Sequence, residues 1–223
     1  MIILSIESST TVCSVALHQN GQLLALTELF GEKSHATFLT LIIEDLVKKN
    51  KLQLSDIQAV AVSEGPGSYT GLRIGVSVAK GLCYALQIPL LAVDTLQVMA
   101  AQLADFEPNA WLCPMLDARR MEVYTAIFQK TKKIYPTKAL VLDQNSFSEF
   151  LENQKIYFFG DGSGKFEKIC SHTNAFFVEN CYPSAKFVGK LAFQNPKEVD
   201  LAYFEPHYLK EFQGVAAKNL LKV

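Results

Sequence analysis

Three glycines lie in a short loop whose spacing could bind an anion. Gly65, Gly67 and Gly71 follow an apolar segment that we expect to be a buried strand, and a helix is expected to begin within the loop. Backbone amides at a helix N-terminus can hold a phosphate, and Arg73 could assist them. No Lys-Ser or Lys-Thr pair follows the glycines, so the loop is not a P-loop. A tight turn that binds nothing explains the pattern equally well, so these four residues are phosphate candidates only and we predict no cofactor.

Two acidic residues could hold a metal ion. Glu7 and Asp117 each follow a predicted strand, and two carboxylates in facing turns can bind Mg²⁺ through water. Hydrogen bonding within the turn is the simpler explanation, and we favour it for Asp117. Arg119 and Arg120 follow Asp117 directly and could neutralise its charge.

The histidines and cysteines form no pattern of metal ligands. No two histidines have the i, i+4 spacing that places two ligands on one helix face, and no C-x-x-C pair occurs. The residues concerned are His18, His35, His172, His207, Cys13, Cys83, Cys113, Cys170 and Cys181. We therefore predict no metal site, no catalytic residue, and reduced thiols in a cytosolic protein.

Two predicted helices carry more apolar surface than packing on one sheet requires. The first, expected over residues 34–50 with Ser34 as its N-cap, has an apolar face wider than about 100°. The second, over residues 71–86, carries a row of small residues that would let another backbone approach closely. That row is Gly71, Gly75, Ala79 and Cys83. We predict a partner interface made by Phe38, Leu39, Ile42, Leu46, Gly71, Ile74, Gly75, Val78 and Leu82. Packing on the chain's own sheet is the alternative.

Alternating and apolar segments around these residues predict a mixed sheet flanked by helices. Strands are expected over residues 2–6, 12–18, 22–29, 57–63 and 90–93. Asn20-Gly21 predicts a hairpin turn, and Asp94 can cap a third helix. The resulting order, β-β-β-α-β-α-β-α, is that of the ribonuclease-H-like half-unit, an α/β arrangement.

The second half of the chain repeats the pattern of the first. Asp117 follows Glu7 by 110 residues (117 − 7), and an alternating segment follows each acid. We predict two duplicated lobes, residues 1–106 and 107–223, divided in the polar stretch around Pro108. The end of the second range could pack back on the first lobe. A chance match of two strand–turn–strand units is the alternative.

Composition limits the class of function. Of the 223 residues, 49% are hydrophobic and 19% charged, which suits a folded core and not a disordered chain. Lys and Arg number 21 against 22 Asp and Glu, so the basic excess that drives nucleic-acid binding is absent. No apolar run reaches transmembrane length, and the N-terminus lacks the cationic region of a signal peptide. We expect a cytoplasmic protein without membrane contact.

Four segments together resemble one known family. They are Ile6–Thr10, Gly65–Gly75, Leu116–Tyr124 and Glu205–Lys210. They strongly resemble the TsaB (YeaZ) family of bacterial threonylcarbamoyladenosine synthesis, over nearly the whole chain. The glycine segment is shared with the catalytic paralogue TsaD, whereas the Asp-Ala-Arg and Pro-x-Tyr-Leu segments are typical of TsaB. Arg120 stands where that family usually has glycine, and Lys210 stands where Arg is common.

The resemblance implies an actin-like ATPase fold and a cytosolic role in tRNA modification. The modification attaches threonylcarbamoyl to the adenosine beside the anticodon of ANN-decoding tRNAs. TsaD carries the transfer chemistry, the ATPase TsaE joins the complex, and tRNA is bound only as part of that complex. The resemblance also implies that the two helices of the first lobe dock TsaD. When the chain is alone, they could dock a second copy of it.

One difference from TsaD implies that this chain is not an enzyme. TsaD sequences carry a metal-binding Asn-His-x-x-x-His segment, and Thr95 and Met99 occupy the two histidine positions here. A hydroxyl and a thioether cannot replace two imidazoles for a divalent ion, so the metal's electrostatic role is lost. The sequence predicts a non-catalytic scaffold that docks and stabilises TsaD. One alternative is a nucleotide-hydrolysing enzyme of the sugar-kinase-like class that uses Glu7 and the Gly65–Gly71 loop. A stand-alone RNA-binding module is a further alternative, and a metalloprotease lacks any ligand set.

Overall fold

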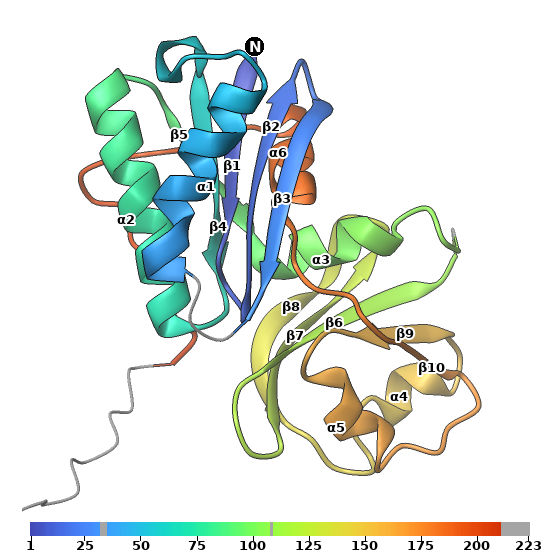
Figure 1. Ribbon diagram of the computed structural model, residues 1–223. Helices are drawn as coiled ribbons and strands as arrows, with labels where there is room; N and C mark the ends of the chain where they lie inside the picture. The colour runs from blue at the N-terminus through green and yellow to red at the C-terminus, as the bar shows by residue number, and fades with distance from the viewer. Residues whose placement is uncertain (32–34, 108, 211–223) are drawn as a thin grey trace, which may run out of the picture.

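The first of two β-sheets organises the N-terminal half of the chain (Figure 1). The computed structural model describes residues 1–31, 35–107 and 109–210. The strands of this sheet are β1 (Ile2–Glu7), β2 (Val12–Gln19), β3 (Gln22–Phe30), β4 (Ala59–Gly65), β5 (Leu90–Asp94) and β11 (Glu198–Val199). They lie in the order β11-β5-β4-β1-β2-β3, with β1, β2 and β3 antiparallel and β1, β4 and β5 parallel. The predicted meander and mixed sheet are confirmed.

Helices cover both faces of this sheet (Figure 1). One face carries α1 (His35–Lys49) and α2 (Tyr69–Leu86), which pack beside each other. The other face carries α3 (Thr95–Leu103) and α6 (Ala185–Gln194). Helix α2 begins two residues earlier than predicted because the Ser68 hydroxyl accepts a hydrogen bond from Gly71 N and caps it. The predicted cap of α1, Ser34, lies outside the described residues.

The second lobe repeats the topology of the first. Its strands and helices are β6 (Trp111–Asp117), β7 (Glu122–Gln129), β8 (Lys132–Val141), α4 (Ser148–Leu151), β9 (Ile156–Phe159), α5 (Ser163–Glu167) and β10 (Ala175–Val178). The sheet order, β10-β9-β6-β7-β8, matches β5-β4-β1-β2-β3. Strand β7 begins and ends 110 residues after β2 (122 − 12 and 129 − 19). The predicted duplication of two lobes is confirmed.

The last part of the chain returns to the first lobe. Helix α6 packs on β1 and β2, and β11 pairs with β5. His18 Nε2 donates to the carbonyl oxygen of Lys186 at 2.9 Å, and Ala185 N donates to Ser14 Oγ at 2.9 Å. The range 107–223 is therefore not one continuous lobe, because residues 185–199 complete the first one.

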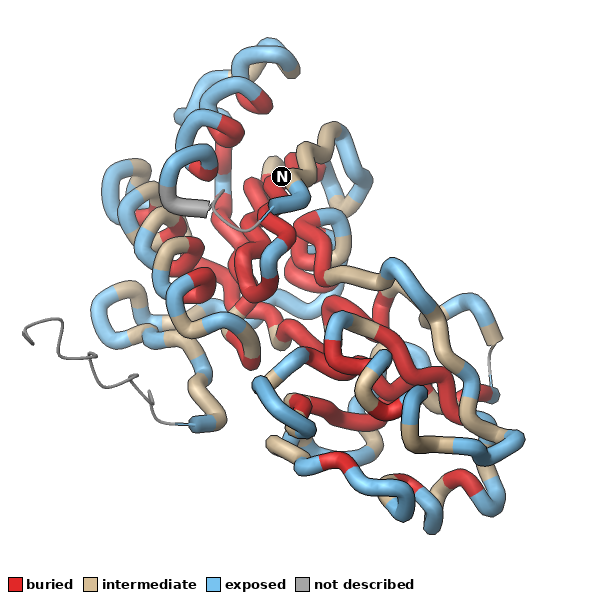
Figure 2. Tube along the Cα trace, turned by 60° about the horizontal axis from the view of Figure 1, so that its bottom comes forward, coloured by how far each residue is buried: buried red, intermediate tan, exposed pale blue. Residues whose placement is uncertain are grey.

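Residues 200–210, here called the strap, follow β11 and run past α2. Lys80 Nζ on α2 donates to the carbonyl oxygens of Ala202 and Phe204, both at 3.1 Å. Buried residues gather inside the molecule (Figure 2): β1, β2, β4, β5, β6, β7 and β9 are mostly buried, whereas β3, β8, β10, β11 and the outward sides of the helices are intermediate or exposed. Among the described residues, none of the helices combines the length and apolarity needed to cross a membrane.

Candidate functional site

A cleft of about 900 Å³ lies between the two lobes. Its wall in the first lobe comes from the turn after β1 and from the loop that leads into α2. Its wall in the second lobe comes from the β6–β7 turn, and the end of the strap closes one side. The predicted residues Gly67, Gly71 and Asp117 line the cleft, whereas Glu7, Gly65 and Arg73 do not. The sequence therefore located both walls but not every side chain that faces the space between them.

The glycines of the loop allow close packing against the turn after β1. A Cβ atom on Gly71 would lie 2.1 Å from the carbonyl oxygen of Ser8, and one on Gly67 would lie 2.5 Å from that of Ser9. Ser68 N donates to Ser9 O at 2.7 Å, so an amide of the loop is bonded within the protein. At Gly65 the carbonyl oxygen of His207 in the strap would meet a Cβ at 2.6 Å. Close packing alone accounts for these glycines, without a bound phosphate.

Arg73 does not line the cleft, although Tyr69 and Tyr208, which it contacts, both do. Its guanidinium carbon lies 4.2 Å from the centre of the Tyr69 ring, and its Nε donates to the hydroxyl of Tyr208 at 3.2 Å. Tyr69 and Tyr208 contact each other with their ring centres 4.8 Å apart. The role of Arg73 toward a phosphate in the loop stays a prediction; in the structure Arg73 holds the strap against α2 by a cation–π contact and a hydrogen bond.

Glu7 is sealed inside the first lobe. Its side chain is fully buried, Oε1 accepts from Ser9 N at 2.6 Å, and Oε2 has no hydrogen-bond partner among the described residues. Burial raises the pKa of the Glu7 carboxyl above its ordinary value, and the nearby hydroxyls of Ser63 and Ser9 offset this only in part. The Glu7 carboxyl therefore does not line the cleft.

We predict that Glu7→Gln stabilises the chain at neutral and alkaline pH. The pKa of Glu7 is higher in the folded than in the unfolded chain, so folding favours the protonated form. The stability that Glu7 contributes to the fold is fully present below its ordinary pKa of 4.5, and it is lost as the pH rises through the higher pKa of the folded chain. Glutamine keeps an acceptor for Ser9 N and cannot ionise. We expect a melting temperature higher by roughly 2–4 °C at pH 8, the effect of about 1 kcal/mol in a chain of this size, and no difference near pH 4. A difference that does not vary between these pH values would contradict the assignment.

Asp117 is held by hydrogen bonds within and beyond its turn. Its Oδ1 accepts from Arg119 N at 2.6 Å and from Lys165 Nζ at 2.7 Å. Its own amide donates to Asp161 Oδ1 at 2.9 Å, and burial raises the pKa of the Asp161 carboxyl. The turn hydrogen bonding favoured from the sequence is confirmed. The expectation that Arg119 or Arg120 neutralises Asp117 is wrong, because the paired cation is Lys165 from α5.

Thr95 and Met99, which the resemblance to TsaD aligns with two histidines, pack in the first lobe and at its junction with the second. Both side chains are fully buried. Thr95 Oγ1 accepts from Gly65 N at 3.2 Å, and Met99 packs in the core that joins α3 to the second lobe. Within the described part of the chain, no three or more His, Cys, Asp or Glu residues gather in a way that could hold a metal ion.

The predicted docking residues on α1 divide into buried and exposed ones. Leu39, Ile42 and Leu46 belong to the core between α1 and the sheet. These three side chains therefore offer little surface to a partner, which corrects their place in the predicted interface. Phe38 is 45% exposed, and its neighbour Leu41 is 56% exposed.

Of the predicted docking residues on α2, some are buried and others are half-buried. Gly71 and Gly75 are buried, and a Cβ on Gly75 would lie 2.2 Å from Ser8 Oγ. The small row therefore packs on the chain's own sheet, which corrects its reading as a partner contact. Ile74, Val78 and Leu82 are half-buried. We call the side chains that remain accessible the outer helix face; it consists of Phe38, Leu41, Ile74, Val78 and Leu82.

The two duplicated lobes, each with a mixed sheet and helices, and the cleft between them define the actin-like ATPase fold class. The structure of an inorganic polyphosphate/ATP-glucomannokinase from Arthrobacter sp. strain KM superposes with a TM-score of 0.52. It covers 87% of this chain and 99% of that one at 12% identity, a likeness of fold alone.

Proteins with higher sequence identity to this chain identify its family within this fold class. A protein-family description, TsaD: tRNA N6-adenosine threonylcarbamoyltransferase, matches residues 30–222. The tRNA threonylcarbamoyladenosine biosynthesis protein TsaB of Bacillus subtilis (strain 168) is 30% identical over 209 residues, 91% of this chain and 86% of that protein. A Pseudomonas aeruginosa structure, described as an uncharacterized protein with similarity to peptidase YEAZ, has a TM-score of 0.82 at 26% identity. It covers 94% of this chain and 99% of that one. The chain belongs to the TsaB (YeaZ) family, within the wider family that includes TsaD.

Proposed function

We propose that this chain is a non-catalytic scaffold in tRNA threonylcarbamoyladenosine biosynthesis, where it docks and stabilises a TsaD-like catalytic subunit. Membership of the family supports the biosynthetic role, because its relatives are named as tRNA threonylcarbamoyladenosine biosynthesis proteins. The observation that carries the scaffold role is the outer helix face. Two adjacent helices there leave apolar side chains accessible, although the cores beneath them are already filled.

The outer helix face has the composition of an interface core. Phe38 and Leu41 extend from α1, and Ile74 and Val78 lie in a row at i, i+4 spacing on α2. Burying such side chains stabilises a complex by roughly 25 cal/mol per Å² of apolar surface, before the cost of association. A partner with the same fold would present the equivalent pair of helices, and two pairs would form a bundle. We therefore expect a TsaD-like subunit to bind here, or a second copy of the chain in its absence.

The interior of the cleft supports a role without catalysis. Glu7 is fully buried and does not line the cleft, Arg73 does not line it either, and Ser68 N of the glycine loop is bonded to the protein itself. A cleft of this size nevertheless makes nucleotide hydrolysis the second candidate function. Calorimetry with ATP and Mg²⁺, and a phosphate-release assay, separate the two. The scaffold proposal expects no turnover by the chain alone. Turnover that Glu7→Ala abolishes would establish the enzyme instead.

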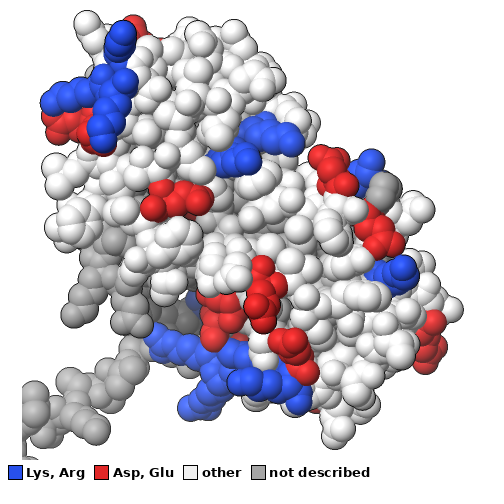
Figure 3. Space-filling view, turned by 45° about the vertical axis from the view of Figure 1, so that its right-hand side comes forward, with Lys and Arg blue, Asp and Glu red and all other residues white. Residues whose placement is uncertain are grey.

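The surface charge supports an indirect relation to tRNA. On the face shown in Figure 3, most charged side chains form small groups separated by uncharged surface, and the larger basic group at the lower edge lies directly beside acidic side chains. Phosphate backbones bind best to continuous basic surface. We expect tRNA, and a TsaE-like ATPase, to join through the assembled complex in the cytoplasm. A gel-shift series in rising salt, with the chain alone, tests whether it binds RNA by itself.

Size exclusion with light scattering, on the chain with and without the TsaD-like protein of the same organism, tests the proposal directly. We expect the mixture to elute as a complex at micromolar concentration and the chain alone as a monomer or a dimer. Separate elution of the two proteins at all tested concentrations would contradict the scaffold role.

A further inference from the structure

We propose that the two lobes are locked at a fixed angle by two latches at opposite ends of β7. The strap latch joins Lys210 of the strap to Glu122 at the start of β7. The helix latch joins Asp94 and Gln97, at the start of α3, to the β7–β8 hairpin. This goes beyond the proposed function, because it describes the chain alone and does not depend on any partner.

The strap latch begins with firm attachment of the strap to the first lobe. His207 N donates to the carbonyl oxygen of Glu64 at 2.6 Å, and Tyr208 is held by Tyr69 and Arg73 as described above. The strap then crosses to the second lobe, where Lys210 Nζ pairs with Glu122 Oε2. The Glu122 side chain is only 17% exposed, so this pair is less screened than a surface ion pair.

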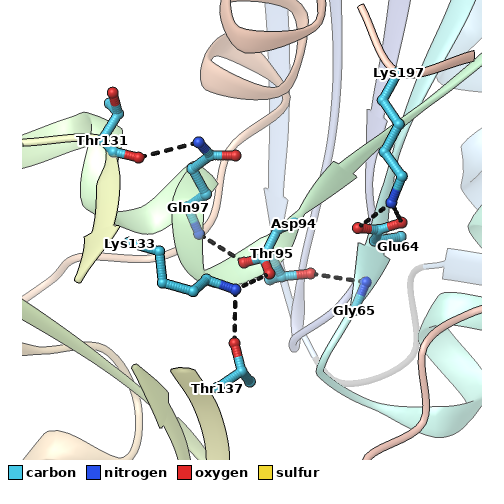
Figure 4. A network of polar contacts seen from close by, with 9 residues as sticks. All are labelled: Glu64, Gly65, Asp94, Thr95, Gln97, Thr131, Lys133, Thr137 and Lys197. Carbon is cyan, nitrogen blue, oxygen red and sulfur yellow. Dashed lines mark hydrogen bonds and ion pairs between the residues drawn. The ribbon is translucent and has the colours of Figure 1, made fainter. Parts of the chain in front are cut away.

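The helix latch is a network on α3 and β8 (Figure 4). Asp94 caps α3 by accepting from Gln97 N at 2.9 Å, and its other oxygen accepts from Lys133 Nζ at 2.8 Å. Lys133 also donates to Thr137 Oγ1 at 2.8 Å, which fixes its ammonium group. Beside this pair, the Gln97 side chain donates to the carbonyl oxygen of Thr131 at 3.0 Å. One short segment of the first lobe thus holds the tip of the second lobe's hairpin.

The register of β7 and β8 places the two latches far apart. Glu122 pairs with Val141 at one end of the hairpin, and Phe128 pairs with Lys133 near the other end. Six residues of extended strand separate Glu122 from Phe128, which corresponds to roughly 20 Å at about 3.4 Å per residue. The lobes also share the apolar core that α3 forms with β6 and β7, but apolar packing is non-directional, so a single latch would still allow the second lobe to turn about that core. Two attachments at this separation oppose both rotation of the second lobe and the hinge motion by which two-lobed proteins open and close around ligands.

Hydrogen–deuterium exchange on the full chain, without any partner, tests the lock. Lys210→Met and Lys133→Met each remove one charge and keep the apolar stem of the side chain. The measured peptides cover residues 65–71 and 116–122, which face each other across the cleft. In each single variant we expect the backbone amides of these peptides to exchange less than about threefold faster than in wild type. In the double variant we expect them to exchange at least about tenfold faster. This more-than-additive response follows from two attachments that substitute for one another.

Matched controls keep the test interpretable. Lys48→Met with Lys49→Met breaks two ion pairs inside α1 and should leave the cleft peptides unchanged. Asp94→Asn with Glu122→Gln removes the ion pair of each latch from the acidic side, retains the α3 cap and the Gln97–Thr131 hydrogen bond, and should reproduce the double lysine variant. Equal exchange in the double variants and wild type would overturn the lock, and so would one single variant that shows the whole effect.

A variant with a charge-reversed ion pair covers the case in which a double variant loses its fold. In the Lys133→Met background, Lys210→Glu together with Glu122→Lys rebuilds the strap ion pair with reversed polarity. Exchange at the cleft should then return to the level of Lys133→Met alone. Failure of this rescue, with exchange in β1 and β4 unchanged, would also overturn the proposal.

Discussion

Ile74→Glu abolishes co-elution of the chain with a TsaD-like partner at micromolar concentration, while the free chain keeps its fold. Ile74 is half-buried on α2, in a row with Val78 beside the buried small row, where it packs on the core of the first lobe and borders the cleft. A carboxylate there would be desolvated in the complex without a partner charge, at a cost of several kcal/mol. We expect at least about a hundredfold loss of affinity, which corresponds to about 2.7 kcal/mol. Analytical size exclusion and calorimetry measure it, and circular dichroism checks the fold.

A second variant and a matched control separate docking from stability. Leu41→Glu changes the more exposed side chain on α1, so it should weaken the complex without disturbing the free chain. Val141→Glu places the same charge on an aliphatic residue that is 66% exposed on β8, in the other lobe, and should bind normally. If the Ile74 and Leu41 variants fold and bind with near-native affinity, the interface lies elsewhere on the chain.

The sequence predicted the elements of the fold well because their signals are local. Alternation in residues 12–18 and the Asn20-Gly21 turn specify a hairpin without reference to the rest of the chain. The offset of 110 residues between Glu7 and Asp117 predicted the second lobe, because a duplicated chain repeats its strand lengths and turns. The hairpin is encoded within a few tens of residues, and so is each copy of the repeated strand–turn–strand unit.

The candidate site was harder to predict because its contacts join distant parts of the chain. Lys165 is 48 residues from Asp117, and Tyr208 is 135 residues from Arg73. The segment Glu205–Lys210 was typical of the family, but nothing in its composition indicated that it would lie against the glycine loop. Glu7 was placed correctly after β1, yet its burial depends on packing by Ser9 and Ser63, which no local pattern reports.

The small row on α2 shows why spacing alone cannot identify a partner. Gly71, Gly75, Ala79 and Cys83 have the spacing that permits close backbone approach, and a close approach does occur. The approaching backbone is that of Ser8 in the same chain, so the pattern was right about geometry and wrong about which surface it serves. A helix on a sheet and a helix on a partner place the same steric demand on such a row.

Gly71→Ala lowers the free energy of unfolding of the isolated chain by about 2–3 kcal/mol, the usual cost of overpacking a filled site. The added Cβ would lie 2.1 Å from the Ser8 carbonyl oxygen, a backbone atom that cannot rotate away. The Ser8 hydroxyl also donates to the Gly71 carbonyl oxygen at 2.9 Å, so separating the two segments breaks this bond as well. The melting temperature should fall by roughly 4–12 °C in a thermal scan.

Gly81→Ala is the matched control, because it makes the same change on the same helix where a Cβ meets nothing within 4 Å. Removing a helical glycine there should stabilise the chain by about 0.5–1 kcal/mol. The pair of variants separates three explanations of Gly71. Packing on the chain's own turn predicts destabilisation without any ligand or partner, whereas a docking or phosphate-binding role predicts normal stability and loss of binding only. Equal melting temperatures for Gly71→Ala and wild type would show that the turn after β1 shifts to accommodate the added methyl group. That result would support the prediction that Gly71 contacts a partner.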